Sequence, residues 1–442
     1  MARANTSCRK RRSEMGDVYV IGSYSTPFKR WPDKTMKDLT RMAYMGVLED
    51  AGIEPRDIEF LWFSNTGWGH DVPAAGNQPA RPAQMNVRGQ TAMAPLVKDG
   101  LFSANVPCIN VEGACASGSL AFHGAWKDIL SGQTRVALAL GVEKTYFPHH
   151  LEAVVKSFVD GTDVEEIPNL AGQLGAICAE CGKAWSTSNE HTIFMDIYAV
   201  LGAWHMWKWG TTREQIAAVA SKNHFHGSLN PLAQYQFEVP VEKVLADYEV
   251  SWPLTRAMCA PLGDGAAAAL VCSEDYLKGL PKAIRDRAVK VLASVAAGGR
   301  HRNMMDTAVG AVAGARAYRI AGITPADVDL AEVHDATAVG EILQTENLGF
   351  CPPGQGGRFA ESGATRYDGA KPVNTSGGLE SKGHPIGATG LSQINEIVIQ
   401  LRREAGKRQV RKANIGLVEN GGGVISVDEF CCAVTVLRKE PA

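Results

Sequence analysis

The sequence predicts an α/β fold built from two copies of one unit, because two repeated spacings agree. A turn that leads into an apolar strand occurs at 52–63 and again at 322–333, with Gly, Ile, Pro and Asp at matching positions. Cys115 and His384 then follow the two turns at nearly the same distance. Each stands before a helical pattern, and the apolar strands that end these patterns are expected at 135–141 and 413–418. Together these registers indicate an internal duplication.

The first copy is expected to begin with a strand at 18–21 and a helix at 38–51. The apolar residues of the helix recur at helical spacing, and Gly52 is a typical residue to end it. The apolar run at 106–111 predicts a buried strand. Helical spacing resumes a few residues later, so that Cys115 is expected near the N-terminus of a helix.

Cys115 is the first candidate catalytic residue. Free backbone N–H groups and the dipole at a helix N-terminus favour the thiolate, which is the nucleophilic form of cysteine. Its neighbours Ala114, Ala116 and Gly118 leave room for a substrate. A cysteine in such surroundings can equally be a small buried apolar residue.

His384 is the second candidate, and the duplication is the reason for choosing it. If the two copies pack about a pseudo-twofold axis, their equivalent strand-to-helix turns face each other and bring His384 to Cys115. A histidine within hydrogen-bond reach activates a thiol. Taken alone, a histidine between glycine and proline would be an ordinary turn residue.

Residues 146–255 have no repeated counterpart and predict an inserted, mostly helical region that covers the site. This region holds five of the nine tryptophans of the chain, Trp185, Trp204, Trp207, Trp209 and Trp252. Such aromatic side chains can line an acyl pocket, or they can pack an insertion that has little core of its own. A strand of small residues at 264–271 then returns to the core, and its counterpart in the second copy is expected at 421–427.

Composition excludes several classes of function. The net charge of −2 offers no field for nucleic acid or an anionic membrane, and no run approaches the roughly 20 apolar residues of a membrane helix. The ten cysteines show no disulfide framework, which predicts a reducing, cytoplasmic location. Cys178 and Cys181 resemble half of a zinc site, but no second pair lies nearby and no metal is expected. The basic residues 1–15 predict a disordered tail.

Four motifs resemble those of the thiolase family and are most similar to its sterol-carrier-protein type. They are EGACASG at 112–118, HDATA at 334–338, the segment 377–390 and NGGG at 420–423. The resemblance implies two βαβαβαββ halves, packed as five αβαβα layers, with an inserted loop domain. The implied N-terminal half is 16–145 with 256–280, the loop domain is 146–255, and the C-terminal half is 281–442.

The resemblance also implies roles for single residues. Cys115 matches the nucleophile that becomes acylated, and His384 matches the base that takes its proton and later returns one. His334 matches the histidine that holds the thioester oxygen in the oxyanion hole for the enolate. The backbone N–H groups of Cys115 and Gly422 match a second oxyanion hole, for the tetrahedral intermediate.

The sequence departs from the family pattern in one respect. Thiolases normally carry a second cysteine as acid and base at the α-carbon, and neither matching motif contains one here. Cys351, Cys431 and Cys432 are near these motifs, while His384 is an alternative that would serve both steps. Relatives that lack this cysteine work with a small zinc-ribbon and OB-fold protein, and the thiolase that cleaves benzoylsuccinyl-CoA is of that kind.

The predicted function is therefore cleavage of a β-ketoacyl-CoA by CoA through an acyl-Cys115 intermediate, with a bulky or aromatic acyl group as one option. Two alternatives stay open: a retro-aldol or retro-Claisen lyase, and a scaffold subunit that binds acyl-CoA without catalysis. Coenzyme A is expected as a substrate, with no bound cofactor and no recognisable cluster of CoA-binding residues. The family resemblance implies a homodimer or tetramer, to which a small partner subunit can be added.

Overall fold

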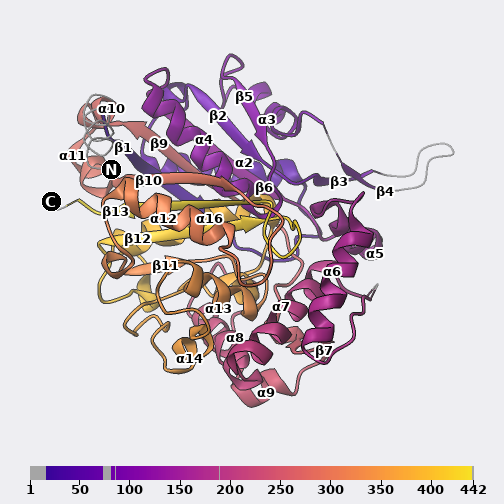
Figure 1. Ribbon diagram of the computed structural model, residues 1–442. Helices are drawn as coiled ribbons and strands as arrows, with labels where there is room; N and C mark the ends of the chain where they lie inside the picture. Colours follow the sequence, from indigo (N-terminus) through magenta and orange to yellow (C-terminus); the bar gives the residue numbers. More distant parts are fainter. Residues whose placement is uncertain (1–15, 73–80, 85, 189, 441–442) are drawn as a thin grey trace.

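The structure is a computed structural model that describes residues 16–72, 81–84, 86–188 and 190–440. The predicted disordered tail at 1–15 lies outside the described residues. Figure 1 shows two parts: a layered α/β body that carries both described ends of the chain, and a group of helices below it.

A mixed sheet of nine described strands runs through the body, and its two ends repeat one strand order. From one edge to the other, the strands are β5 (Cys108–Val111), β2 (Phe60–Ser64), β6 (Val136–Glu143), β9 (Gly265–Ser273), β1 (Val18–Ser25), β10 (Val289–Gly298), β13 (Cys431–Arg438), β12 (Ile415–Gly422) and β11 (Leu330–Glu332). The order β1-β9-β6-β2 therefore returns as β10-β13-β12-β11. This repeat confirms the predicted duplication.

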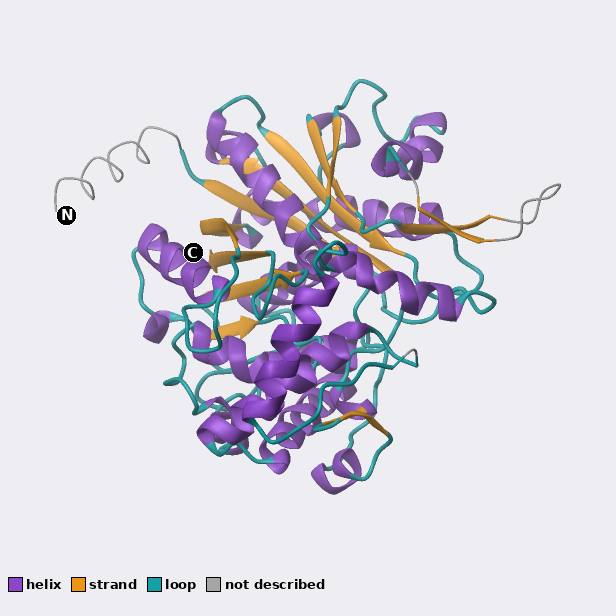
Figure 2. Cartoon of the chain, turned by 45° about the vertical axis from the view of Figure 1, so that its right-hand side comes forward, coloured by secondary structure: helices purple, strands orange, loops and turns teal. Residues whose placement is uncertain are grey.

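The two copies share a central layer of helices. They meet at the sheet where Tyr19 pairs with Lys290 and Val20 with Val289. Between them, α4 (Ser117–Ser131) and α16 (Ile386–Leu401) pack their apolar residues against strands of both copies. The outer faces are covered by α2 (Met36–Ala51) and α3 (Arg88–Lys98) on the first copy and by α12 (Val309–Ala321) on the second. Helices therefore alternate with the two ends of the sheet in five layers, as expected, within the body drawn in Figures 1 and 2.

The repeated turn has the same local structure in both copies. Helix α2 ends at Gly52 with φ of 64°, and α12 ends at Gly322 with φ of 71°. Glycine adopts this left-handed conformation without the cost of a Cβ, which explains why both copies use it. A short 3-10 turn follows each helix, η1 (Pro55–Asp57) and η5 (Pro325–Asp327).

Two expectations about strands were wrong. The strand at 264–271 is buried as β9, but its counterpart is β13, because 421 and 422 belong to β12 and 423–430 form the loop after it. The strand predicted at 106–111 exists as β5, but it is not buried: within the described ranges it pairs with β2 alone, at the sheet edge, and Ile109 is 43% exposed. An apolar run does not distinguish a central strand from an edge strand that awaits a partner.

The segment 146–255 contributes most of the helices below the body. They are α5 (Leu151–Ser157), α6 (Ile167–Glu180), α7 (Ile193–Trp209), α8 (Arg213–Ser228) and α9 (Val241–Leu245). Helices α6 to α9 share a core with α13 (Ala338–Asn347) and α14 (Gly356–Glu361) of the second copy, and Trp204 is buried in it. Val154 of α5 packs instead with Trp68, Phe147 and Ile386. Trp207 is instead 53% exposed. Packing of the segment's own core therefore explains part of its aromatic content.

The remaining elements are short connections. They are β3 (Trp68–Val72), β4 (Arg81–Gln84), η2 (Ala114–Ala116), η3 (Phe158–Gly161), β7 (Glu249–Ser251), β8 (Leu254–Thr255), η4 (Arg256–Met258), α10 (Glu274–Lys278), α11 (Lys282–Arg287), α15 (Gly378–Lys382) and η6 (Gly406–Arg408). In the ranges that the structure describes, no helix has both the length and the apolar character needed to cross a membrane.

Candidate active site

Cys115 lies in the 3-10 turn η2, between the end of β5 and the start of α4, as predicted. The turn is tight, since Ala114 has φ of 46°, a conformation that L-residues rarely adopt. Ser117 secures it by accepting the backbone N–H of Gly113 at 2.9 Å and donating to the carbonyl of Ala114 at 2.6 Å. The carboxylate of Glu112 accepts the N–H of Ala114 at 2.6 Å. These contacts hold the cysteine where strand and helix meet.

His384 comes from the second copy and meets Cys115 directly. Its Nε2 atom lies 3.2 Å from Sγ of Cys115. On the other side of the ring, Nδ1 lies 2.7 Å from Oγ1 of Thr389, whose hydroxyl donates to the carbonyl of Pro385 at 3.1 Å. Because that hydroxyl hydrogen is already used, Oγ1 accepts a hydrogen bond from Nδ1–H. The lone pair of Nε2 is then free to take the thiol proton.

Glycines allow the two turns to approach this closely. A Cβ atom on Gly118 of α4 would lie 3.0 Å from the backbone N of Gly390, and one on Gly390 would lie 2.4 Å from the backbone N of Ser119. Both distances are too short for real Cβ atoms to be added without movement. The small residues around Cys115 therefore make room for α16 as well as for a substrate.

His334 is the third group at the site, just beyond the end of β11. The sulfur of Cys115 and one ring nitrogen each of His334 and His384 lie within 4.8 Å of one another. The backbone N–H of His334 donates to Glu419 at 3.0 Å. The centroids of the two imidazole rings are 5.6 Å apart. The structure thus brings together all three side chains that the sequence analysis selected.

The surroundings separate the two histidines electrostatically. Burial, with the nearby charge of His334, holds the pKa of His384 well below its usual range. Burial also disfavours the charged form of His334, but the Cys115 sulfur and the Glu429 carboxylate outweigh it and hold the pKa of His334 well above its usual range. His384 is therefore a neutral base and His334 a charged donor. Paired groups whose pKa values are pushed apart in this way are typical of acid/base sites.

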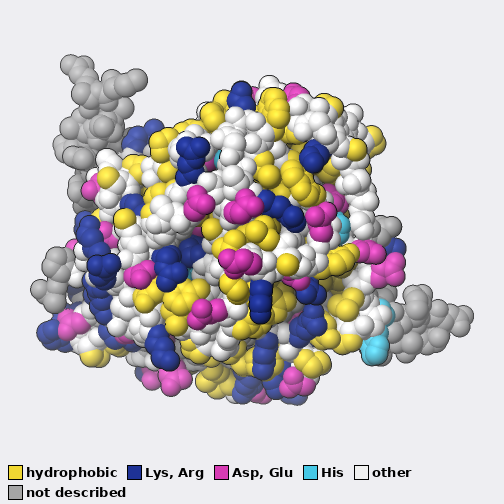
Figure 3. All heavy atoms as spheres, turned by 90° about the horizontal axis from the view of Figure 1, so that it is seen from below, with side chains coloured by type: hydrophobic (Ala, Val, Ile, Leu, Met, Phe, Trp, Pro, Cys, Tyr) yellow, Lys and Arg dark blue, Asp and Glu magenta, His cyan; other side chains and the backbone are white. Residues whose placement is uncertain are grey.

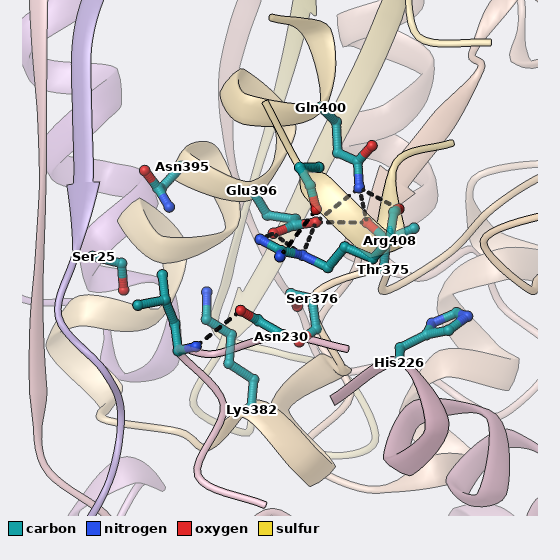
Figure 4. Close-up of polar contacts among 12 residues, drawn as sticks. Ser25, His226, Asn230, Thr375, Ser376, Lys382, Asn395, Glu396, Gln400 and Arg408 are labelled. Carbon is teal, nitrogen blue, oxygen red and sulfur yellow. Dashed lines mark hydrogen bonds and ion pairs between the residues drawn. The ribbon is translucent and has the colours of Figure 1, made fainter. Parts of the chain in front are cut away.

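The segment that leads to His384 is anchored by a buried polar network (Figure 4). Arg408 and Glu396 pair at 2.9 Å, and Glu396 also accepts the hydroxyl of Thr375 at 3.0 Å. In the same segment, Ser376 donates its hydroxyl to Glu332 at 2.6 Å, and Lys382 donates to Ser392 of α16. The loop with His384 is thereby tied to both β11 and α16.

A cavity of about 240 Å³ opens at Cys115. Aromatic and apolar side chains form much of its wall, namely Trp68, Phe158, Phe194 and Ile386. The rings of Trp68 and Phe158 stack with their centroids 4.9 Å apart. Arg88, Glu112 and Asp160 add charged groups to the lining. None of the five tryptophans of 146–255 is among the residues that line this cavity.

Gly422, the fourth site residue selected from the sequence, lies against the turn of Cys115. A Cβ atom on Gly422 would lie 2.1 Å from the carbonyl oxygen of Gly113 and 2.6 Å from the backbone N of Ala116. Only glycine permits this approach of β12 to η2. The geometry is compatible with the backbone N–H groups expected for an oxyanion hole.

The three cysteines considered for the missing acid/base are poorly suited to that work. Burial raises the pKa of Cys431 to about 12, and its thiol lies 3.4 Å from the carbonyl of Gly113. Burial also holds the pKa of Cys432 well above its usual range, and raises that of Cys351 to about 12. A thiol that cannot ionise near neutral pH cannot cycle a proton efficiently. Cys178 and Cys181 are free thiols at the end of α6.

Three residues that contribute to the site were not predicted from the sequence. Thr389 carries a weak local signal, as a hydroxyl residue in the first turn of the helix after His384. Trp68 and Glu429 carry none, because each reaches the site from a loop or strand that is distant along the chain.

Figure 3 shows acidic and basic side chains interspersed on the face seen from below, so no cluster there marks a site for the phosphates of coenzyme A.

Comparison with known proteins identifies the class of this site. The model of the thiolase N-terminal domain matches residues 18–251, and the model described as thiolase C-terminal domain-like matches residues 295–435. The duplicated fold and the site thus define an acyltransferase enzyme. The chain belongs to the thiolase family.

Similar proteins cover nearly the whole chain. An acetyl-CoA acetyltransferase of Methanothermobacter thermautotrophicus is 37% identical over 92% of this chain and 97% of its own length. Sterol carrier protein 2 of Bos taurus is 35% identical over 92% of this chain and 71% of its own length. The benzoylsuccinyl-CoA thiolase subunit BbsB of Thauera aromatica is 32% identical over 89% of this chain and 91% of its own length. A solved structure titled Ltp2-ChsH2(DUF35) aldolase shares the fold, with a TM-score of 0.68 at 20% identity over 96% of this chain and 98% of that one.

Proposed function

We propose that this enzyme cleaves a β-ketoacyl-CoA with coenzyme A through an acyl group carried on Cys115. The observation that carries the proposal is the 3.2 Å contact between Sγ of Cys115 and Nε2 of His384, with Thr389 holding the proton on Nδ1. A thiol paired with an oriented neutral imidazole is the arrangement that nucleophilic acyl transfer requires.

In the first half-reaction, His384 takes the thiol proton and Sγ of Cys115 attacks the keto carbon. The C–C bond breaks, and its electrons pass to the α-carbon as an enolate whose oxygen binds His334. The proton on His384 then moves to the α-carbon, which releases the first acyl-CoA. His384 thus replaces the missing second cysteine in this step.

In the second half-reaction, coenzyme A attacks the acyl-Cys115 thioester. Its thiol proton passes to His384, the bond to Sγ breaks, and the same proton returns to Cys115. We assign the backbone N–H groups of Cys115 and Gly422 to the oxygen of the tetrahedral intermediate. Coenzyme A is a substrate here, and no bound cofactor is required.

An aromatic or otherwise bulky acyl group is the proposed substrate class. Trp68, Phe158 and Phe194 line the cavity at Cys115 and provide flat apolar surfaces for such a group. The similarity to the benzoylsuccinyl-CoA thiolase subunit of Thauera aromatica supports this choice. Benzoylsuccinyl-CoA is therefore the first compound to assay.

Mass spectrometry of the protein after incubation with a β-ketoacyl-CoA tests the proposal. An acyl adduct is expected on Cys115, and Cys115→Ala should abolish both the adduct and turnover. His384→Ala should cost a similar amount, because nucleophile and base fail as a unit. Full turnover by Cys115→Ala would end the proposal.

Two alternatives are distinguished by simple measurements. A retro-aldol or retro-Claisen lyase would form products without free coenzyme A, and the similarity in fold to an aldolase makes this control necessary. A scaffold without catalysis would show no fast iodoacetamide labelling of a single cysteine that coenzyme A protects.

The assembly is part of the proposal. We assign 16–145 with 256–280 and 281–442 to the two halves, and 146–255 to the loop domain. The exposed edge strand β5, with Ile109 on its surface, favours a homodimer or tetramer. A small zinc-ribbon and OB-fold subunit is the proposed further partner. Gel filtration and metal analysis of the protein from its native source would test it, since full activity in a lone, zinc-free homodimer would contradict it.

The free state of all described cysteines favours the cytoplasm.

A further inference from the structure

Glu429 faces the ring of His334 from the loop that joins β12 to β13. Its Oε1 atom lies 3.4 Å from Nδ1 of His334. Both side chains are largely buried, with 4% of His334 and 15% of Glu429 exposed. In the part of the chain that the structure describes, neither ring nitrogen of His334 has a well-directed hydrogen bond. The carboxylate is thus placed to favour a positive charge on this ring, as the Cys115 sulfur also does.

The carboxylate occupies a place that the backbone reserves for it. A Cβ atom on Gly421 of β12 would lie 1.8 Å from Oε1 and 1.9 Å from Cδ of Glu429. Gln344 of α13 donates its amide to Oε1 at 3.3 Å. Glu429 is therefore seated between β12 and α13, beside His334.

The neighbouring acids are used differently. Glu419 accepts the backbone N–H of His334 at 3.0 Å and contacts the thiol of Cys432 at 3.3 Å. Burial, together with the charge of Glu429, raises the pKa of Glu419 to about 8, which favours its protonated form. Asp428 lies 3.2 Å from Arg302 and is neutralised by it. Glu429 is thus the carboxylate that acts with the Cys115 sulfur to favour the charged form of His334.

We propose that Glu429 is a positioning residue that keeps His334 doubly protonated while its ring binds the enolate oxygen of the substrate. The inference rests on the proposed function. An imidazole whose Nδ1–H faces a carboxylate still has an Nε2–H to donate only if both nitrogens carry protons. A charged donor stabilises an enolate oxygen more than a neutral donor does. A stabilised enolate forms more readily, by C–C cleavage or by loss of an α-proton to a weak base, which lets the enzyme work without a second cysteine.

Two half-reactions of the full-length protein separate this inference from the proposed function. With acetyl-CoA as the probe, acylation of Cys115 depends on Cys115 and His384, whereas exchange of the α-protons with D2O also requires the enolate. Glu429→Gln should lower the exchange rate roughly 100-fold, as loss of a charged donor does, and leave the acylation rate little changed. Asp428→Asn is the matched control in the same loop, and it should change neither rate.

The pH profile provides a readout that a purely structural role would not move. In Glu429→Gln the alkaline limb of the exchange profile should shift to lower pH, because His334 loses its second proton more readily without the carboxylate. The other titratable groups around His334 are common to both proteins, namely Cys115, Tyr198, His384, Glu419, Cys431 and Cys432.

Each outcome decides between the two claims. Wild-type exchange and an unshifted profile in Glu429→Gln would overturn the inference, while absence of acyl-Cys115 in the wild type after incubation with a β-ketoacyl-CoA would overturn the proposed function instead. If Glu429→Gln does not fold, nitrogen NMR of the histidine side chains in the wild type decides. A doubly protonated His334 ring at about pH 7.5 supports the inference, and a neutral ring overturns it.

Discussion

The reactivity proposed for Cys115 depends on which nitrogen of His384 carries the proton. Thr389 decides this, because its hydroxyl donates to Pro385 and can only accept from Nδ1 of the imidazole. Without that acceptor, the ring can rotate or change tautomer, and Nε2 is no longer held as a base toward the sulfur. A hydroxyl that never touches the substrate thus prepares the nucleophile.

Replacement of Thr389 by valine should therefore lower kcat roughly 10- to 100-fold, the usual cost of losing a group that orients a histidine. Thr389→Ser keeps the hydroxyl and should stay near the wild-type rate. The measurement is steady-state turnover together with the rate of Cys115 labelling by iodoacetamide. A Thr389→Val protein with both rates unchanged would show that the tautomer is set in another way.

Helices α4 and α16 bring the two halves of the site together. Each helix starts beside one catalytic candidate, and glycines at 118 and 390 let the two backbones touch. The contact therefore sets the distance between Sγ and Nε2, in addition to filling the central layer. Glycines at this helix crossing therefore matter to the site because they set the helix separation, although they have no reactive side chain.

Gly390→Ala is expected to push the helices apart, because its Cβ would lie 2.4 Å from the backbone N of Ser119. The free energy of unfolding should fall by about 1–3 kcal/mol, as in other overpacked cores. Turnover should fall up to roughly 100-fold, since small misplacements of reacting groups are costly. Denaturant unfolding and steady-state assays measure both.

The matched control is a helical glycine with free space around it. Among the described residues, no atom outside the chain neighbours and the backbone of its own helix lies within 4 Å of a Cβ placed on Gly172 of α6. Gly172→Ala should therefore raise the free energy of unfolding by about 0.5–1 kcal/mol and leave turnover unchanged. Equal stability and equal turnover of Gly390→Ala and Gly172→Ala would contradict the proposal that the contact between α4 and α16 sets the distance between Sγ and Nε2.

Across the whole molecule, Glu143 joins the two copies. It ends β6 of the first copy and accepts the backbone N–H of Gly387 in α16 at 2.9 Å. Its carboxylate also accepts hydrogen bonds from Asn65 at 2.8 Å and from the hydroxyl of Thr66 at 2.7 Å. Complete burial raises the pKa of Glu143 to about 7 despite these donors. One carboxyl group thereby links the loop after β2, β6 and the helix that follows His384.

This pKa predicts how stability depends on pH. Between about pH 4.5 and 7 the folded protein keeps the proton of Glu143, which the unfolded chain releases. The stabilisation is therefore complete at low pH and is lost as the pH rises through 7. Glu332 and Glu419, whose pKa values burial raises to about 7 and about 8, act in the same direction.

Glu143→Gln should make the decline between pH 5 and 8 shallower by roughly 3 kcal/mol, at about 1.4 kcal/mol per pKa unit. Urea unfolding at several pH values measures it. Glu49→Gln on the exposed face of α2 is the control and should keep the wild-type slope. An equal slope in Glu143→Gln would mean that the buried carboxyl is already ionised in the folded protein.

Local patterns sufficed for much of the fold. The glycine that ends a helix, the short turn after it and the apolar strand are each encoded within a dozen residues, and the chain repeats them. The same locality placed Cys115 at the start of a helix. The pairing of Cys115 with His384 could also be predicted, because a duplicated unit implies a symmetry that relates its turns.

Other features depended on contacts between distant segments. Periodicity predicted the strand at 106–111 but not that it would lie at an edge of the sheet. It also placed the counterpart of β9 at 421–427, in the end of β12 and the loop after it, whereas the counterpart is β13. Thr389, Trp68 and Glu429 reach the site through loops and a helix turn whose sequences resemble many others. The sequence alone determined the duplicated fold and the reactive pair, because short-range chain geometry encodes them. Only the tertiary structure decided which side chains tune that pair, because long-range packing sets their distances and their burial.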